Sequence, residues 1–192
     1  MSGNETQKHP LVTELEQLLT VHRMGDGWYL GMRKPGGKGR VFGGQVIAQA
    51  LAAAQDTVGN ERIAHSMHAY FVLAGDPKVP IVYEVERTRD GRSFTTRSVK
   101  AIQHGRPIFI MIVSFHNNEA GLDHQAAMPD VPAPEALPNE DAMLRDILPT
   151  LPEQVQRYYR RERPIELRPV EYGRYLGKKI EVHEMKLTSI AI

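Results

Sequence analysis

The fold is decided by Phe42-Gly-Gly-Gln-Val-Ile-Ala-Gln-Ala-Leu-Ala-Ala-Ala-Gln-Asp-Thr-Val58. Alanine, leucine and glutamine are strong helix formers, so this stretch predicts a helix of about four turns, opened by the Gly43-Gly44 pair. Its apolar residues leave almost no polar face. A helix that is apolar nearly all round has to be buried, so we expect it at the centre of the fold.

The segments that can bury this helix follow it directly in the chain. Strand-like segments are expected at residues 64–73, 79–87, 92–103 and 108–115, joined by short turns. Consecutive strands joined in this way are antiparallel. The first of them is apolar on both faces, which predicts a central strand. The sequence therefore predicts an α+β fold in which one long core helix is wrapped by an antiparallel sheet.

The flanking segments are simpler. Residues 10–19 carry leucines at helical spacing and predict a short amphipathic helix, and residues 21–30 predict a hairpin around Gly25-Asp26-Gly27. Six prolines between residues 123 and 152 exclude a strand or a long helix there. We expect an extended linker after Asn117, with short helices near 141–148 and 153–161 and a strand near 163–172.

Composition limits the classes of partner. The 192 residues support one good hydrophobic core, and 24 Lys and Arg against 23 Asp and Glu argue against a nucleic-acid surface. The absence of Cys excludes a disulfide framework, a thiolate nucleophile and a Cys-based metal site. Residues 1–9 are polar and no apolar run has bilayer length, so we expect a cytoplasmic protein without a membrane partner.

Residues 34–40 are rich in basic side chains and glycine. The first interpretation is a solvated flexible loop, because charge runs are usually solvated. The alternative is a contact for the phosphates of an anionic ligand at the mouth of the core helix. Both interpretations stay open on the sequence.

The start of the core helix is the first candidate for chemistry, since the G-x-S-x-G, H-E-x-x-H and Walker motifs are all missing. Gly43 and Gly44 offer free backbone N–H groups and the positive end of a helix dipole, which suit an oxyanion or a thioester carbonyl. Alternatively, these glycines only let the helix enter a crowded core. Gln45 and Gln49 form a polar stripe near the same entrance.

His65 is the second candidate. It is separated by an odd number of positions from His68, so the two point to opposite faces of a straight strand and we expect no metal site from them. A lone histidine in a strand is more often a hydrogen-bonded core residue than a catalyst. Histidine is nevertheless the commonest general base.

Several motifs recur in the order that is typical of one family. They are Arg40-Val-Phe-Gly-Gly-Gln-Val-Ile-Ala-Gln-Ala-Leu51, His65-Ser-Met-His-Ala-Tyr-Phe71, Gly75-Asp76, Arg89-Asp-Gly-Arg-Ser-Phe94, Ile102-Gln-His-Gly-Arg-Pro-Ile-Phe109 and Arg168-Pro-Val-Glu171. With them, most of residues 11–181 resembles the acyl-CoA thioesterase II family. The resemblance implies a hot-dog fold, two such units per chain, and hydrolysis of fatty acyl-CoA to free acid and CoA. It implies an activated water, with neither a covalent nucleophile nor a metal or other cofactor.

The same resemblance guides the choice of site residues. The family places its catalytic Asp, Ser or Thr, and Gln in the second hot-dog unit, and none of the three has a counterpart here. We therefore expect a first hot-dog domain at 1–118, then a proline-rich linker and the truncated start of a second repeat at 119–192. His65 matches a position that the family associates with activity, so we expect it at the catalytic site, with Gly43, Gly44 and Gln45 lining the substrate.

Two functional hypotheses follow. The chain is an acyl-CoA thioesterase, or it is a catalytically silent hot-dog module that binds acyl-CoA or a partner subunit. The match to the family stops after Glu181, and residues 182–192 read like the product of a frameshift or premature stop. A lone unit would expose a strand edge and an apolar patch, so we expect a homo-oligomer.

Overall fold

A computed structural model describes residues 9–145, 147–170 and 189–191, which fall into two compact units. One unit comprises Glu14–Leu122, and the other combines the chain before Glu14 with the chain after Leu122. The elements of the first part of the chain are α1 (Pro10–Leu19), β1 (Val21–Gly25), β2 (Trp28–Gly31), α2 (Gly43–Gln55), β3 (Arg62–Phe71), β4 (Ile81–Asp90), β5 (Phe94–Gln103) and β6 (Arg106–Asn117). The predicted core helix, hairpin and strands are confirmed.

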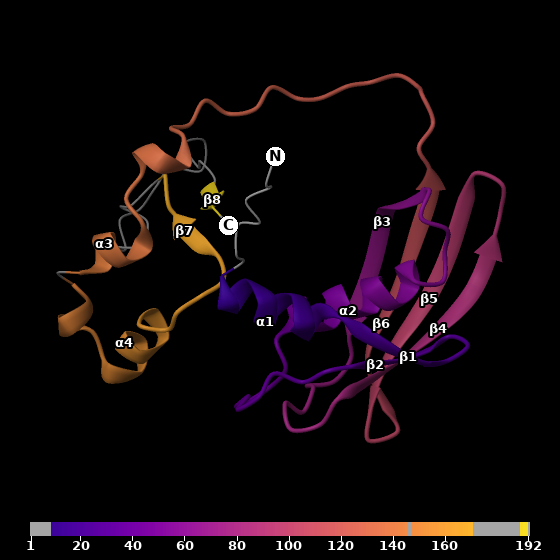
Figure 1. Cartoon of the computed structure of the whole chain (residues 1–192), viewed down its shortest axis with the longest axis horizontal. Helices are drawn as coiled ribbons and strands as arrows, with labels where there is room; N and C mark the ends of the chain where they lie inside the picture. The colour runs from indigo at the N-terminus through magenta and orange to yellow at the C-terminus, as the bar shows by residue number, and fades with distance from the viewer. Residues whose placement is uncertain (1–8, 146, 171–188, 192) are drawn as a thin grey trace, which may run out of the picture. The chain divides into compact units, whose positions relative to one another are not determined.

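The strands of the Glu14–Leu122 unit form one antiparallel six-stranded sheet, with α2 packed on one face (Figure 1). Ala50, Ala53 and Ala54 of α2 are fully buried in one cluster with the inward-facing residues of the sheet. Alanine has no bulk beyond Cβ, so the helix axis can lie close to the strands. This architecture is the predicted α+β arrangement of a helix and an antiparallel sheet.

The burial of α2 is one-sided, which corrects the prediction of a helix buried all round. Gln45, Val46 and Gln49 face the interior together with the alanines, whereas Ile47 and Leu51 are only half-buried. The sheet covers one face of the helix, because a layered domain needs only one apolar face of each element.

The strand predicted to be central lies at an edge. The sheet order is β1-β2-β4-β5-β6-β3, so among the described residues β3 pairs with β6 alone. Phe71 is 58% exposed and Met67 45% exposed. The prediction was wrong because apolar faces indicate what a strand can pack against, whereas its place in the sheet depends on which distant segments supply backbone hydrogen bonds.

Arg97 of β5 connects the C-terminal end of α2 to the sheet through hydrogen bonds. Its side chain is 1% exposed, yet every nitrogen has a partner. Its Nε donates to Thr57 Oγ1 at 2.7 Å, Nη2 donates to Thr57 O at 3.1 Å, and Nη2 also pairs with Asp90 Oδ1 at 2.6 Å. The guanidinium therefore caps the chain that leaves α2 and ties it to the end of β4.

In the residues that the structure describes, the elements of the second unit are short. They are 3₁₀ turns at Pro134–Ala136 and Leu148–Thr150, the helices α3 (Glu140–Leu144) and α4 (Glu153–Tyr159), and the strands β7 (Glu166–Arg168) and β8 (Ser189–Ala191), which pair antiparallel. Residues 118–133 have no regular structure, as predicted for the proline-rich linker (Figure 1). Most of the 182–192 tail lies outside the described residues. Among those that are described, no helix combines the length and apolarity needed to cross a membrane.

Candidate functional site

An apolar cavity of about 400 Å³ opens beside the start of α2. Its walls come from α2, from β3 and the loop after it, and from the beginning of β6. They are formed by Arg40, Val41, Gly43, Val46, Phe71, Val72, Leu73, Ala74, Gly75, Ile108 and Phe109. Backbone hydrogen bonds hold these walls together, since Val41 N–H donates to Gly75 O at 2.9 Å and Val72 N–H donates to Ile108 O at 2.9 Å.

Gly43 and Gly44 form the first turn of α2 at this cavity. The preceding residue, Phe42, is extended (φ −68°, ψ 129°) and provides no side-chain cap. The first N–H groups of a helix have no partner within it, so those of Gly43 and Gly44 carry the positive end of the helix dipole without a capping oxygen. A Cβ at Gly43 would lie 2.9 Å from Phe71 Cζ, which means that glycine is required for the ring to close over the helix start.

The structure directs Gln45 away from this cavity. Gln45 is 7% exposed, and its Nε2 donates to Met32 O at 3.1 Å. Gln49 is fully buried, donates to Met32 O at 3.0 Å and to Leu18 O, and accepts a hydrogen bond from Tyr83 Oη at 2.8 Å. The expected polar stripe at the entrance is therefore an interior network that joins α2 to the sheet and to the loop after β2.

His65 lies on the outer face of the sheet, opposite to α2. It contacts Ser114 and His116, which alternate along β6 with the core residues Val113 and Phe115. Its Nε2 is 2.8 Å from Ser114 Oγ, and its ring centroid is 5.0 Å from that of His116. The argument that His65 and His68 must point to opposite faces fails, because a bulge between Ala64 and Ser66 shifts the alternation by one residue.

The structure does not bring His65 together with Gly43, Gly44 and Gln45. Phe71, which touches the start of α2, is six positions further along β3, or roughly 20 Å at the usual rise of a strand. His65 also lies on the other face of the sheet. Gly43 alone of the predicted site residues lines the cavity, while Gly44 is exposed beside it.

Comparison with known proteins identifies the chain's relatives. Residues 33–116 match the family model of the acyl-CoA thioesterase N-terminal domain. Acyl-CoA thioesterase 2 of Haemophilus influenzae is 43% identical over 158 residues, which are 82% of this chain and 55% of that protein. Acyl-coenzyme A thioesterase 8 of Homo sapiens is 48% identical over 138 residues, 68% of this chain and 43% of that protein.

Solved structures agree with these relatives. The crystal structure of the acyl-CoA thioesterase II TesB2 from Mycobacterium marinum superposes with a TM-score of 0.63 at 36% identity, covering 82% of this chain and 52% of that one. The family model, the curated relatives and this structure together support the acyl-CoA thioesterase II family for this chain. A hot-dog protein from Alicyclobacillus acidocaldarius, 19% identical, superposes with a TM-score of 0.62 over 82% of this chain and 55% of that one. The expected hot-dog fold is thereby confirmed.

The chain spans about half the length of the acyl-CoA thioesterases that it matches. The matched family model is that of their N-terminal domain. All the residues that line the cavity beside Gly43 fall within the segment that this model matches.

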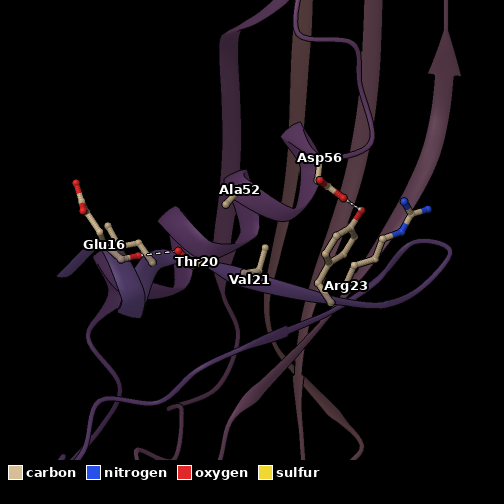
Figure 2. A pocket seen from close by; sticks show the side chains of 8 residues that line it. Glu16, Thr20, Val21, Arg23, Ala52 and Asp56 are labelled. Carbon is tan, nitrogen blue, oxygen red and sulfur yellow. Dashed lines mark hydrogen bonds between the residues drawn. The ribbon is translucent and has the colours of Figure 1, made fainter. Parts of the chain in front are cut away.

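The Glu14–Leu122 unit has a second cavity, of about 540 Å³, between α1, β1, β2 and the half-buried side of α2. Ala52 of α2 and Asp56, the residue after α2, line this cavity together with Val21 and Arg23 (Figure 2). Asp56 accepts a hydrogen bond from the Tyr29 hydroxyl at 2.8 Å. Burial, followed by the contact with this carboxylate, raises the pKa of Tyr29 to about 12. No residue that the sequence singled out as a site lines this cavity.

Sequence reasoning missed most of the walls of the cavity beside Gly43. Phe71, Ile108 and Phe109 were expected only as strand residues, and nothing in their alternation distinguishes a cavity wall from a core position. Arg40 carried a usable signal, because it stands two residues before Phe42 at the helix entrance. Within the described ranges, no group of three or more His, Cys, Asp or Glu side chains could hold a metal ion.

Proposed function

We propose that this chain hydrolyses fatty acyl-CoA to free fatty acid and CoA, as an acyl-CoA thioesterase. The uncapped start of α2 at an apolar cavity carries this proposal. The N–H groups of Gly43 and Gly44 are suited to hold the thioester carbonyl oxygen, which gains negative charge when water adds to the carbon. Collapse of this intermediate breaks the C–S bond, and the leaving CoA thiolate takes up the proton that the water gives away.

The cavity walls suit the acyl side of such a substrate. Phe71, Leu73 and Phe109 provide an apolar surface for the first carbons of the chain. His65 lies on the other face of the sheet, and the proposal assigns it no contact with the thioester in this cavity.

A second candidate function is a silent module that binds acyl-CoA without hydrolysing it. One observation favours it: among the described residues that line the cavity, none is an Asp, Glu or His that could activate water. The two candidates share the binding cavity and differ in turnover. They can therefore be separated on one preparation.

The test of activity is thiol release from acyl-CoA of several chain lengths by wild type and two glycine variants. Gly43→Ala brings its new methyl against the Phe71 ring and should lower kcat about tenfold or more, because one oxyanion donor is displaced. Gly25→Ala is the matched control, since a Cβ there meets nothing within 4 Å. The proposal is supported if wild type releases thiol and if Gly43→Ala, but not Gly25→Ala, lowers the rate of release. Release no faster than the buffer rate at every chain length rejects it.

Calorimetry with a non-hydrolysable thioether analogue of acyl-CoA then decides the alternative. Binding that Gly43→Ala weakens, on a protein with no turnover, supports the silent module. Absence of both binding and turnover rejects both candidates.

We further propose that the chain forms a homo-oligomer through β3. Within the described ranges, one side of this edge strand has no strand paired to it, and Met67, Tyr70 and Phe71 add exposed apolar surface to it. Light scattering should give a dimer or larger species, and Tyr70→Lys should weaken it because lysine on an edge opposes strand pairing. A monodisperse monomer at all concentrations would overturn this proposal. A cytoplasmic location stays a prediction, to be checked by microscopy of the tagged chain.

A further inference from the structure

Loops of the Glu14–Leu122 unit gather at the end of the sheet where α2 begins. The 32–41 loop touches the 74–80 loop, since Val41 N–H donates to Gly75 O at 2.9 Å and a Cβ on Gly37 would lie 2.9 Å from Pro77. The turn between β5 and β6 joins them through His104, whose Nε2 is 3.4 Å from Asp76 Oδ2. Together these three segments surround the cavity's Arg40 and Gly75 walls.

The three segments carry an excess of positive charge. Their cationic residues, which we call the basic rim, are Arg33, Lys34, Lys38, Arg40, Lys78 and Arg106. Asp76 is the single acidic residue of the same segments. The backbone N–H of Lys78 and the nearby His104 hold the pKa of Asp76 below its ordinary value, so this carboxylate is charged but already engaged.

No cation of the rim is neutralised within the described part of the chain. All six side chains are exposed, and none pairs with a carboxylate there. Elsewhere in the same unit cations do have partners, as in the Arg87–Asp26 pair at 2.8 Å and the Lys100–Glu84 pair at 3.2 Å. Six cations without an ion-pair partner in the described residues, carried by three loops that contact one another, with Arg40 at the cavity itself, create a field that attracts polyanions.

Hydrogen bonds from a buried glutamine fix the loop that carries Lys78. Gln103, 5% exposed, accepts from Asp76 N–H at 2.7 Å and donates to Asp76 O at 2.9 Å and to Val79 O at 3.0 Å. A buried amide that satisfies three backbone groups fixes the course of this loop. The position of Lys78 relative to the β5–β6 turn is therefore set before any ligand binds.

We propose that the basic rim binds the phosphates of the adenine nucleotide of CoA, while the acyl thioester occupies the cavity beside Gly43. This inference rests on the proposed function and names how that site recognises the CoA half of its substrate. Arg40 belongs to both the rim and the cavity wall, which makes the two regions continuous. Arginine and lysine are the side chains that form charge-assisted hydrogen bonds with phosphate oxygens. The rim accordingly provides the affinity for CoA, and the apolar cavity provides that for the acyl chain.

The test compares a rim variant with a variant of equal charge. The rim variant is Lys34→Gln/Lys38→Gln/Lys78→Gln, which leaves the cavity-lining Arg40 in place. The control, Arg23→Gln/Arg87→Gln/Lys100→Gln, removes three cations outside the rim. Calorimetry of the full chain with adenosine 3′,5′-bisphosphate should show binding that weakens about tenfold or more in the rim variant, weakens with added salt, and changes less than twofold in the control. Equal loss in both variants, or equally tight binding of inorganic phosphate, overturns the nucleotide assignment.

Kinetics separates this inference from the proposed function. With acyl-CoA, the rim variant should have a KM raised about tenfold at nearly unchanged kcat, which is the signature of lost uniform binding. With an acyl N-acetylcysteamine thioester, which carries no phosphate, both variants should match wild type within about twofold. Equal KM values for acyl-CoA in wild type and rim variant overturn the inference. A wild type that cleaves neither thioester refutes the proposed function alone, and the nucleotide calorimetry still decides for or against the rim.

Discussion

Replacement of Gln49 by leucine is the sharpest test of how α2 is held. On the sequence alone, this residue belongs to a polar stripe at the helix entrance, and the change would be nearly neutral. In the structure, Gln49 is fully buried and its amide bonds three groups: Tyr83 Oη at 2.8 Å, Met32 O at 3.0 Å, and Leu18 O. Leucine is close to glutamine in volume, so Gln49→Leu removes the hydrogen bonds with little change in packing.

The magnitude follows from what is left unsatisfied. Tyr83 is fully buried, and burial raises the pKa of its hydroxyl far above the ordinary value, so it remains a neutral donor. Its other acceptor, Val46 O at 3.4 Å, is too distant to replace Gln49. A buried donor without an acceptor costs about 1–3 kcal/mol of stability, and the loss of the hydrogen bonds to Met32 O and Leu18 O adds to this cost. The burial of the apolar leucine side chain offsets part of it. We expect a net loss of about 2–3 kcal/mol in the free energy of unfolding.

The assay is urea unfolding of wild type, Gln49→Leu, Tyr83→Phe and the double variant, with Gln17→Leu as control. Gln17 is exposed on α1, so its change should stay within about 0.5 kcal/mol. The double variant should lose less than the two single losses added together, with a coupling of about 1 kcal/mol, because each change alone orphans the other's partner. A Gln49→Leu loss as small as that of Gln17→Leu, or additive losses in the cycle, would refute the reasoning.

Three further predictions rest on other contacts. Arg97→Met should lower the free energy of unfolding by about 3–5 kcal/mol, because the buried acceptors at Thr57 and its neighbours lose their donor. A loss below about 1 kcal/mol, measured by urea unfolding, would contradict this prediction. The pKa of Tyr29 is raised from 10.0 to about 12, so the contribution of this hydroxyl to stability is complete below pH 10 and is lost as the pH rises toward 12. The difference in the free energy of unfolding between wild type and Tyr29→Phe should therefore shrink over that pH range. A difference that stays constant would argue against the raised pKa. His65→Ala removes an exposed side chain, so it should leave the melting temperature nearly unchanged. It should also leave the affinity of the cavity beside Gly43 for an acyl-CoA analogue unchanged. A loss of that affinity would show that His65 reaches the cavity.

Much of the candidate site could not have been predicted from the sequence. Gly43 and Gly44 were identifiable because a glycine pair at a helix start has a local reason, namely backbone that lies close to something else. Phe71, Ile108 and Phe109 were not, since they come from strands far apart in the chain and form a cavity only once β3 and β6 are paired. His65 was misplaced by a single bulge, which no alternation pattern reveals.

The sequence by itself determined the helices, the strands and their antiparallel order, because helix propensity, alternation and turn residues act between neighbours in the chain. It also determined the proline-rich stretch after Asn117, since proline lacks the N–H that helices and sheets need. Only the tertiary structure decided that β3 is an edge, that Gln45 and Gln49 face inward, and that the loop that carries Arg40 meets the 74–80 loop at one cavity. Each of these depends on which distant backbone and side-chain groups satisfy one another's hydrogen bonds, and contiguous residues carry no record of that choice.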